Sequence, residues 1–359
     1  MSRDRPLRVA YTLEHCWHPV PGGSARAANQ VARELLRRDD VELVGVAGRH
    51  RHPPHPSFAP PLGVHQLPIA RPLLYEAWNR FGRPQVERAT GSVDVCHSTI
   101  AIPAGTAAPH VVTVHDVAFV HSPERFTRHG ARVMRTGLER CRRADLVLCP
   151  SRATIEDLVQ LGFDSGRLRL VQWGVEPTAV TDADLERVRV HYRLPDRFVL
   201  FVGTVEPRKN LRRLAQAAAR LDDRITLVVA GADGWGDAGT GELPGQFLGF
   251  VPDADLPAIY SLATVFAYPS LQEGFGMPIL EAMAYGVPVV TSRGSSTEEV
   301  SDGAAVLVDP TNVDSIAAGI DAAATDATLW VELGRERAAR STWAATAERT
   351  LAAYREVSA

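Results

Sequence analysis

The sequence has few cysteines, and none of them is paired in a local motif. The four cysteines of this 359-residue chain lie far apart, and no C-x-x-C pair occurs among them (Cys16, Cys96, Cys141 and Cys149). Such spacing differs from that of a disulfide framework. We therefore expect reduced, mostly buried thiols and a cytoplasmic location.

Long apolar runs and a basic excess are also missing. No apolar stretch approaches the ~20 residues that a membrane span needs. The formal net charge is −3, whereas nucleic-acid-binding chains usually carry a basic excess, so we expect no nucleic-acid partner. The start of the chain runs from charged residues into a short strand at 7–13, unlike a signal peptide. The length suggests two domains, each large enough for a core of its own.

What the sequence does contain is a strand–loop–helix–strand stretch between Val265 and Ser292. Its first four residues form an apolar run that predicts a buried parallel strand, which Pro269 ends. A loop with two glycines follows, and Pro278 suits the first residue of a helix. Residues 287–290 predict the next buried strand. Such a unit is typical of an open α/β sheet, where ligands bind at the carboxyl ends of the strands.

Two carboxylates flank this loop, and we expect both to border one crevice. Glu273 lies in the loop, and Glu281 is predicted in the first turn of the helix. Loop glycines and a helix N-terminus offer amide donors to a phosphate, while carboxylates accept hydrogen bonds from hydroxyl groups. The combination suits a sugar nucleotide. A capped turn in which Glu281 only stabilises its own helix is the alternative.

A second anion site is predicted near the N-terminus. After the first strand, Pro21-Gly22-Gly23-Ser24 opens a helix, whose N-terminus could receive a phosphate. The turn is not G-x-G-x-x-G, so the dinucleotide fingerprint is absent, and a purely structural turn is the alternative.

A histidine is predicted at the functional edge of the same half. The strand 111–114 delivers His115 and Asp116 to its carboxyl end, where a histidine can donate a hydrogen bond to a sugar hydroxyl. A capping aspartate beside a satisfied loop histidine is the alternative.

Basic residues gather in two stretches of the first half. The segment 71–88 is amphipathic, and a long helix rich in arginine is predicted from Ser122 to Arg143. The first stretch is interpreted as an ordinary amphipathic helix that packs on its own domain, and the second as a helix whose charged face is exposed to solvent. Contact with an anionic lipid surface or a lipid-linked acceptor is the other interpretation.

Two adjacent cations lie between a strand and a helix in the second half. The buried strand 198–202 leads into Gly203-Thr-Val-Glu-Pro-Arg208-Lys209-Asn210, and a helix begins at Leu211. Charges and helix dipole together suit a diphosphate clamp that stabilises a leaving group. A basic loop without a ligand is the alternative. The glycine-rich segment 231–241 predicts a flexible loop.

The stretch Glu273-Gly-Phe-Gly-Met-Pro-Ile-Leu-Glu281 resembles the E-x7-E signature of retaining glycosyltransferases of family 4, and further short motifs follow over nearly the whole chain. The resemblance implies the GT-B fold, an α/β class with two Rossmann-like, doubly wound parallel-sheet domains facing across a cleft. It implies an acceptor-binding domain at 1–175, a linker at 176–196 and a nucleotide-sugar-binding domain at 197–340. It also implies that the terminal helix, 341–359, packs back on the first domain.

The resemblance also implies a role for each matching residue. Glu273 would bind the donor's sugar hydroxyls, Glu281 its ribose, and His115 its sugar. Lys209 matches the family's lysine, but Thr204 occupies the usual arginine position, so we expect Arg208 to supply that charge. The implied catalytic residues are Lys209, Arg208, Glu273 and His115; the implied donor-binding residues are Gly22, Gly23, Gly203, Thr204, Phe250, Val251, Phe275, Gly276, Met277, Pro278 and Glu281.

The implied activity is retaining hexosyl transfer from a nucleotide sugar to a glycan, a lipid-linked saccharide or a small glycoside. GDP-mannose is favoured because GTVEPRKN resembles mannosyltransferase-like members of the family. No cofactor is expected besides the nucleotide sugar, and no metal, because no D-x-D motif occupies a suitable position. We expect a cytoplasmic enzyme of glycan biosynthesis, with peripheral contact at the inner face of the membrane as a further hypothesis. A sugar-nucleotide epimerase, a phosphorylase on the same fold and a non-catalytic sugar-nucleotide-binding subunit are the alternatives.

Overall fold

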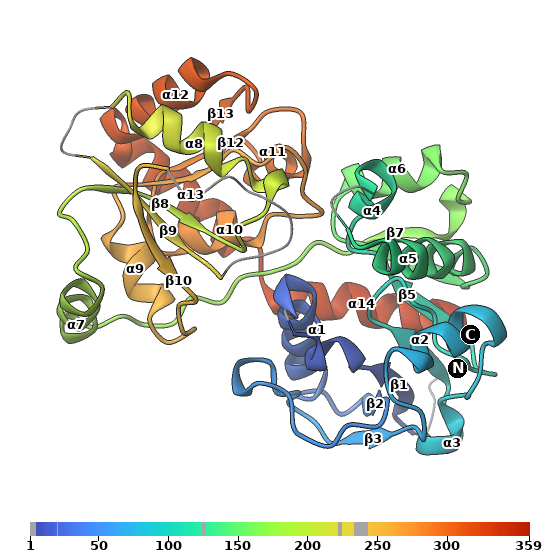
Figure 1. The fold of residues 1–359 in the computed structure, drawn as a ribbon. Helices are drawn as coiled ribbons and strands as arrows, with labels where there is room; N and C mark the ends of the chain where they lie inside the picture. The colour runs from blue at the N-terminus through green and yellow to red at the C-terminus, as the bar shows by residue number, and fades with distance from the viewer. Residues whose placement is uncertain (1–4, 20, 124–125, 222–224, 233–242) are drawn as a thin grey trace. The chain divides into compact units, whose positions relative to one another are not determined.

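The computed structural model describes residues 5–19, 21–123, 126–221, 225–232 and 243–359. These residues form two compact units (Figure 1). Unit 1 comprises Met1–Trp173 with Trp343–Ala359, and unit 2 comprises Gly174–Thr342. Most of the predicted glycine-rich loop, 233–242, lies outside the described residues.

A parallel sheet of seven strands forms the centre of unit 1, in the order β3-β2-β1-β4-β5-β6-β7. Val9 of the central strand pairs with Leu43 on one side and with Val95 on the other. The central strands of a parallel sheet are covered on both faces, which explains why β1 and β2 are largely buried and apolar, whereas the edge strand β3 is exposed. The strands are β1 (Leu7–Thr12), β2 (Val41–Ala47), β3 (Val64–Gln66), β4 (Val95–Ser98), β5 (His110–Thr113), β6 (Leu146–Cys149) and β7 (Leu168–Leu170).

Seven α-helices accompany this sheet in the described part of unit 1. They are α1 (Gly22–Leu35), α2 (Leu73–Phe81), α3 (Glu87–Thr90), α4 (Ala118–His121), α5 (Arg128–Cys141), α6 (Arg152–Gln160) and α14 (Trp343–Ser358), with short 3-10 helices η1 (Glu14–Trp17), η2 (Pro56–Phe58) and η4 (Ser165–Arg167). The predicted single basic helix from Ser122 to Arg143 is wrong. Thr127 accepts a hydrogen bond from the Gly130 N–H at 3.0 Å and so caps a helix that begins only at Arg128.

The last helix of the chain, α14, is part of unit 1 and packs against α1 (Figure 1). The hydroxyl group of Tyr354 lies 2.6 Å from Nδ1 of His97 at the end of β4. Thr346 donates a hydrogen bond to the Gln172 carbonyl at 2.9 Å. These polar contacts fix both ends of the helix on the sheet of unit 1.

Unit 2 contains a parallel sheet of six strands in the order β10-β9-β8-β11-β12-β13. All five residues of β8, FVLFV, are buried, as expected of a central strand in a covered sheet. The strands are β8 (Phe198–Val202), β9 (Thr226–Ala230), β10 (Gln246–Gly249), β11 (Val265–Tyr268), β12 (Val289–Ser292) and β13 (Val306–Val308).

The helices of unit 2 follow the same alternating pattern. They are α7 (Asp182–Tyr192), α8 (Leu211–Ala218), α9 (Leu256–Leu262), α10 (Met277–Ala284), α11 (Ser296–Ser301), α12 (Val313–Thr325) and α13 (Ala327–Ala339), with the 3-10 helix η5 (Pro207–Lys209). A capping box of Thr181 and Asp184 starts α7. The other end of α7 packs on α9, where Arg187 and Tyr192 both bond the carboxylate of Asp255, at 2.7 and 2.8 Å.

The predicted class, two parallel α/β units, is confirmed. In each sheet the strand order reverses beside the first strand of the unit, between β1 and β4 and between β8 and β11. Ligands of open α/β sheets bind outside the carboxyl ends of the strands at such a switch point. No helix within the described residues is long and apolar enough to cross a lipid bilayer. All four cysteines are buried thiols.

Candidate active site

The switch point of unit 2 brings two distant loops into contact. One loop follows β8 and contains η5, and the other follows β11 and leads to α10. The N–H of Leu271 in the second loop donates to the Arg208 carbonyl in the first at 2.8 Å. Because β8 and β11 are adjacent parallel strands, both loops leave the same edge of the sheet.

An ion cluster fills this edge and joins three of the predicted residues. The carboxylate of Glu273 accepts hydrogen bonds from Lys209 Nζ at 2.6 Å and from Arg208 Nη1 at 2.7 Å. The side chains of Glu273 and Lys209 are each only 7% exposed. The cation pair predicted from the first loop is thus held by a carboxylate from the second.

Burial and the neighbouring cations shift the pKa of Glu273 in opposite directions. Burial alone would raise the pKa of the Glu273 carboxyl, but the charges of Arg208 and Lys209 outweigh it and lower that pKa to about 2. Burial, together with the nearby charge of Arg208, lowers the pKa of the Lys209 ammonium, and Glu273 opposes that shift. Glu273 is therefore ionised at neutral pH and acts as a hydrogen-bond acceptor.

A tyrosine that the sequence analysis did not single out completes the surroundings of Lys209. Lys209 Nζ donates to the hydroxyl oxygen of Tyr268, the last residue of β11. Burial raises the pKa of Tyr268 well above its ordinary value, so the phenol stays protonated. The signal that could have revealed this contact is the place of Tyr268 at the carboxyl end of a strand next to the switch point.

Glu206 was also missed, although it lies inside the motif that was analysed. Thr204 donates to its carboxylate at 2.6 Å, and Arg208 Nε donates to its other oxygen at 2.8 Å. Glu206 and Glu273 therefore hold the Arg208 guanidinium from two directions. The carboxylate of Glu206 thus bridges Thr204 and Arg208.

The loop after β11 turns into α10 at Gly276. This residue has φ +104°, a conformation that L side chains rarely adopt, and a Cβ here would lie 3.1 Å from Thr297 Cγ2. The helix begins at Met277, so Pro278 is its second residue and not its first. Phe275 and Met277 point their side chains into the core, where they are buried. A ligand at this turn would meet main-chain groups.

Glu281 lies one turn further along than predicted. With the helix starting at Met277, Glu281 falls in the second turn, so its placement in the first turn was wrong. Its carboxylate accepts a hydrogen bond from the Tyr260 hydroxyl of α9 at 2.8 Å. Tyr260 is buried and stacks on Tyr285, with ring centres 5.7 Å apart.

The remaining donor-binding candidates of unit 2 lie after β8 and β10. Gly203 has φ +147°, and its N–H donates to the Ala230 carbonyl at 3.0 Å. Phe250 directly follows β10 with an exposed ring, whereas Val251 is buried. Residues after the carboxyl ends of neighbouring strands share one edge of a parallel sheet, which is the edge that carries the ion cluster.

Gly22 and Gly23 form the start of α1 in unit 1. Gly22 has φ +66°, and a Cβ there would meet no atom within 4 Å. No side chain of the described residues caps this helix start. The first turn is therefore open and presents main-chain amides, as the predicted anion site requires.

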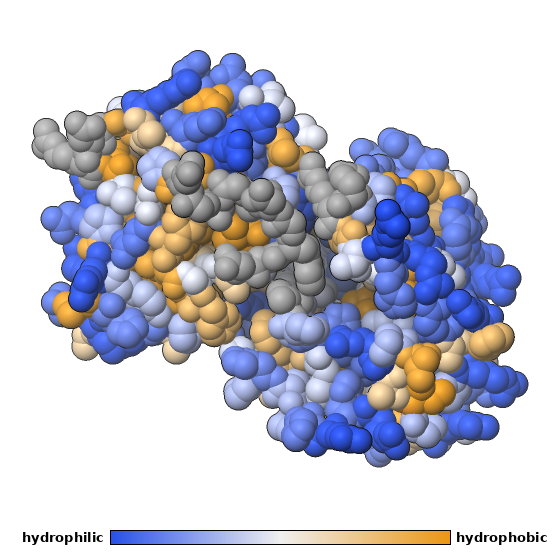
Figure 2. All heavy atoms as spheres, in the orientation of Figure 1, coloured by the Kyte–Doolittle hydropathy of each residue, from blue (hydrophilic) through white to orange (hydrophobic). Residues whose placement is uncertain are grey.

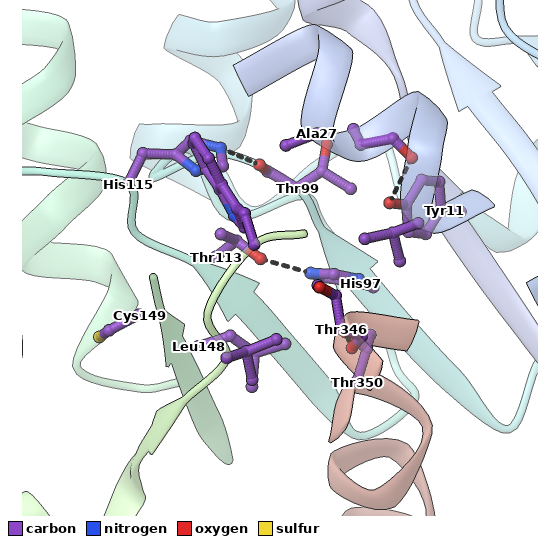
Figure 3. Close-up of a pocket in the computed structure, with 14 residues that line it drawn as sticks. Tyr11, Ala27, His97, Thr99, Thr113, His115, Leu148, Cys149, Thr346 and Thr350 are labelled. Carbon is purple, nitrogen blue, oxygen red and sulfur yellow. Dashed lines mark hydrogen bonds between the residues drawn. The ribbon is translucent and has the colours of Figure 1, made fainter. Parts of the chain in front are cut away.

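His115 follows β5 in unit 1 and lines a small cavity (Figure 3). Its Nε2 lies 2.8 Å from the Thr99 carbonyl, which can only accept, so Nε2 carries the proton. The other ring nitrogen, Nδ1, is buried and has no partner among the described residues. Burial lowers the pKa of His115, so the ring is neutral and Nδ1 is an acceptor. In this structure the donating nitrogen is used within the protein, and the role of His115 toward a donor sugar stays a prediction.

The cavity beside His115 is lined by residues of several elements, and most of its lining surface is apolar. His97 bonds Thr113 at 2.8 Å across its floor, and Thr346 of α14 closes one side (Figure 3). The ring of Trp173 meets His115 edge to face at 5.3 Å. The volume of the cavity is about 30 Å³. This is room for one or two water molecules and not for a sugar ring.

Comparison with known proteins supplies the family. Residues 21–179 match the family model described as Glycosyltransferase Family 4, and residues 184–340 match that of Glycosyl transferases group 1. The O-antigen chain mannosyltransferase B of Escherichia coli is 35% identical over 266 residues, which cover 68% of this chain and 70% of that relative. The chain belongs to the group 1 glycosyltransferases of family 4.

Solved structures place this glycosyltransferase in the GT-B fold. Sucrose-phosphate synthase from Thermosynechococcus elongatus matches with a TM-score of 0.74 at 20% identity, over 98% of each chain. HepE from Anabaena, in a structure with UDP and glucose, matches with a TM-score of 0.70 at 18% identity, over 96% of this chain and 98% of HepE. Likeness at these identities shows the fold alone, and it confirms the predicted GT-B class.

A metal site is not evident in the described part of this glycosyltransferase. Among those residues, no three His, Cys, Asp or Glu side chains group as ligands of one metal ion. The carboxylates of the ion cluster are occupied by arginine and lysine. Independence from metal therefore stays a prediction for experiment.

Proposed function

We propose that this glycosyltransferase moves a hexose from a nucleotide sugar to a hydroxyl acceptor and retains the anomeric configuration. The observation that carries the proposal is the cation pair of Arg208 and Lys209, held by Glu273 at the switch point of unit 2. GDP-mannose is the donor that we favour, because the Escherichia coli relative is a mannosyltransferase. The acceptor would be a glycan, a lipid-linked saccharide or a small glycoside.

Each group of the site has a task in this proposal. Arg208 and Lys209 bind the diphosphate, and Glu273 accepts hydrogen bonds from the donor's sugar. The main chain around Gly276 supports that sugar. In unit 2, Glu281 would bind the ribose, Phe250 and Val251 the base, and Gly203 and Thr204 would lie beside the diphosphate. In unit 1, Gly22 and Gly23 would face the phosphate and the acceptor, and His115 would contact the sugar.

The proposed reaction exchanges one bond of the donor's anomeric carbon for another and moves one proton. The bond between the anomeric carbon and the diphosphate oxygen breaks, and the acceptor oxygen bonds to the same face of that carbon. The acceptor's proton passes to an oxygen of the leaving diphosphate. Two fixed cations stabilise the charge that develops there, and because they are held in place before reaction, little reorganisation is needed.

Donor binding tests the proposal most directly. The protein is titrated with GDP-mannose, UDP-glucose and UDP-GlcNAc, and its unfolding temperature is followed. A ligand at 100 times its dissociation constant adds about 2.7 kcal/mol to stability. We expect one nucleotide sugar to raise the transition well above the others, and no response to any of them would overturn the proposal.

Product analysis then distinguishes the alternatives. With donor and acceptor glycosides, NMR of the new linkage should show the donor's anomeric configuration, and chelator should leave the rate unchanged. An epimerase would change the donor without any acceptor, a phosphorylase would consume or release inorganic phosphate, and a binding subunit would do neither. Inversion at the anomeric carbon would contradict the retaining mechanism.

We also propose that α2 of unit 1 contacts an anionic lipid surface. Its first and last residues, Leu73 and Phe81, are 69% and 74% exposed, and Figure 2 shows apolar surface over α2 among hydrophilic residues. Glu76 of α2 bonds Arg132 of α5 at 2.5 Å, which sets this surface beside the exposed arginines of α5. Exposed apolar side chains next to arginines suit the headgroup region of an anionic bilayer.

A further inference from the structure

Lys209 is the single lysine of the sequence, which has 39 lysine and arginine residues in all. This one ammonium group lies buried inside the ion cluster, next to the guanidinium of Arg208, with which it shares the carboxylate of Glu273. A lysine ammonium is a compact point charge with three donors, whereas arginine presents a wide planar fork. The position therefore calls for an ammonium in a defined orientation.

Two of the three ammonium donors of Lys209 have fixed partners. One goes to Glu273 Oε1 at 2.6 Å, and one goes to the hydroxyl oxygen of Tyr268. Nζ also lies 4.8 Å from the centre of the Tyr268 ring. Because an ammonium is tetrahedral, two fixed donors and the side-chain stem determine where the third N–H points.

The Tyr268 ring is itself immobilised by its neighbours. It is buried, and it stacks against Phe201 at 5.4 Å and Phe266 at 5.7 Å, each at an angle of 19°. Its backbone belongs to a central strand of the sheet. A hydroxyl on such a ring is a rigid acceptor, unlike the end of a flexible side chain.

We infer that Tyr268 is a positioning residue, whose hydroxyl orients the Lys209 ammonium so that its remaining N–H is available to the leaving diphosphate. The inference rests on the proposed function, because it names the group that makes the proposed cation effective. Tyr268 contacts no substrate in this account, and it acts through Lys209.

The variant Tyr268→Phe removes the hydroxyl and keeps the stacked ring. We expect its kcat to fall about tenfold or more, while the dissociation constant for GDP or UDP changes less than threefold, because the charge remains and only its orientation is lost. The matched control is Tyr192→Phe, which removes a hydroxyl that bonds the Asp255 carboxylate elsewhere in unit 2. The control should keep wild-type kinetics.

The single lysine also allows a measurement without substrate. Protein labelled with ¹³C at lysine Cε should give one side-chain resonance, whose titration reports the ammonium of Lys209. Tyr268→Phe takes away an acceptor that favours the charged form, so the midpoint of this titration should move to lower pH. The alkaline limb of the kcat profile should move with it, and Tyr192→Phe should leave both in place.

The outcomes separate this inference from the function on which it rests. If the unaltered protein transfers sugar and Tyr268→Phe changes neither kcat nor the lysine resonance, the inference is wrong and the function stands. If the unaltered protein takes up no nucleotide sugar, the proposed function fails, and the positioning role fails with it. A fall in both kcat and diphosphate affinity together with a lower unfolding temperature would indicate a structural role and would also overturn the inference.

Discussion

At the scale of single residues, charge compensation decides what the site can do. Three ion pairs join two cations and two carboxylates in a largely buried place: Arg208 with Glu206, Arg208 with Glu273, and Lys209 with Glu273. A buried charge without a partner is costly, so Lys209 and Glu273 stabilise each other's charged forms, and Arg208 stabilises that of Glu273. Under the proposed function, this cluster would meet the hydroxyl groups and the diphosphate of the donor.

Lys209 and Glu281 should give different kinetic defects. Lys209→Ala should lower kcat by about 10²-fold or more, because a fixed cation that faces the developing charge is lost. Lys209→Arg should not restore the rate, since a guanidinium cannot reproduce the orientation of a buried ammonium. Glu281→Ala should chiefly weaken donor binding. Steady-state kinetics with saturating and limiting donor distinguish these effects, and unchanged kinetics in all three variants would exclude the assignment.

At the scale of elements, helix starts place the candidate groups. Gly276, the residue directly before α10, has a positive φ, and so does Gly22, the first residue of α1. Neither start has a side-chain cap among the described residues. Each strand–turn–helix junction thus leaves main-chain amides near the sheet edge, where an anion can use them.

A prediction at this scale is that helix α2 binds to anionic lipid membranes. In sedimentation with phosphatidylglycerol-containing vesicles, the double variant Leu73→Ser, Phe81→Ser should bind about tenfold more weakly, because both apolar side chains lose their burial in lipid. Leu329→Ser is the control, since that residue is half exposed on α13 in unit 2. Equal binding to pure phosphatidylcholine, or no binding by the unaltered protein, would contradict the proposal.

At the scale of the whole molecule, the two units differ in histidine content. Eleven of the twelve histidines belong to unit 1, and His191 is the one in unit 2. Burial lowers the pKa of both His15 and His97 to about 3, and these residues are only 2% and 3% exposed. The folded unit therefore holds these rings neutral, whereas the unfolded chain protonates them near pH 6.5.

Mild acid should consequently destabilise unit 1. The stabilising contribution is complete above about pH 6.5, and it is lost as the pH falls toward 3, because the unfolded state binds more protons in that range. At pH 5 the loss is about 2 kcal/mol for each of the two histidines. Hydrogen exchange at pH 7 and pH 5 should show protection falling in unit 1 before unit 2. His97→Gln should reduce the difference, and equal loss in both units would contradict this account.

Local patterns predicted the buried strands and the parallel α/β class, but they were wrong about a single basic helix from Ser122 to Arg143. The apolar runs of β8 and β11 are continuous because central parallel strands are covered on both faces. Such runs can be recognised from their residue types and their length alone. Boundaries were less secure. The strand predicted at 287–290 is β12 at Val289–Ser292, since Pro288 has no N–H to donate to a sheet.

By itself, the sequence determined the two α/β units, the loops at the sheet edges, and a cation pair and two carboxylates as separate candidate groups, because spacing and residue type carry that information. Only the tertiary structure decided which groups meet. It joined Glu273 to both cations, Tyr268 to Lys209, and Glu206 to Arg208. These contacts link the ends of β8 and β11, some 60 residues apart in the chain. Their adjacency follows from the order of strands in the sheet, which no local pattern encodes.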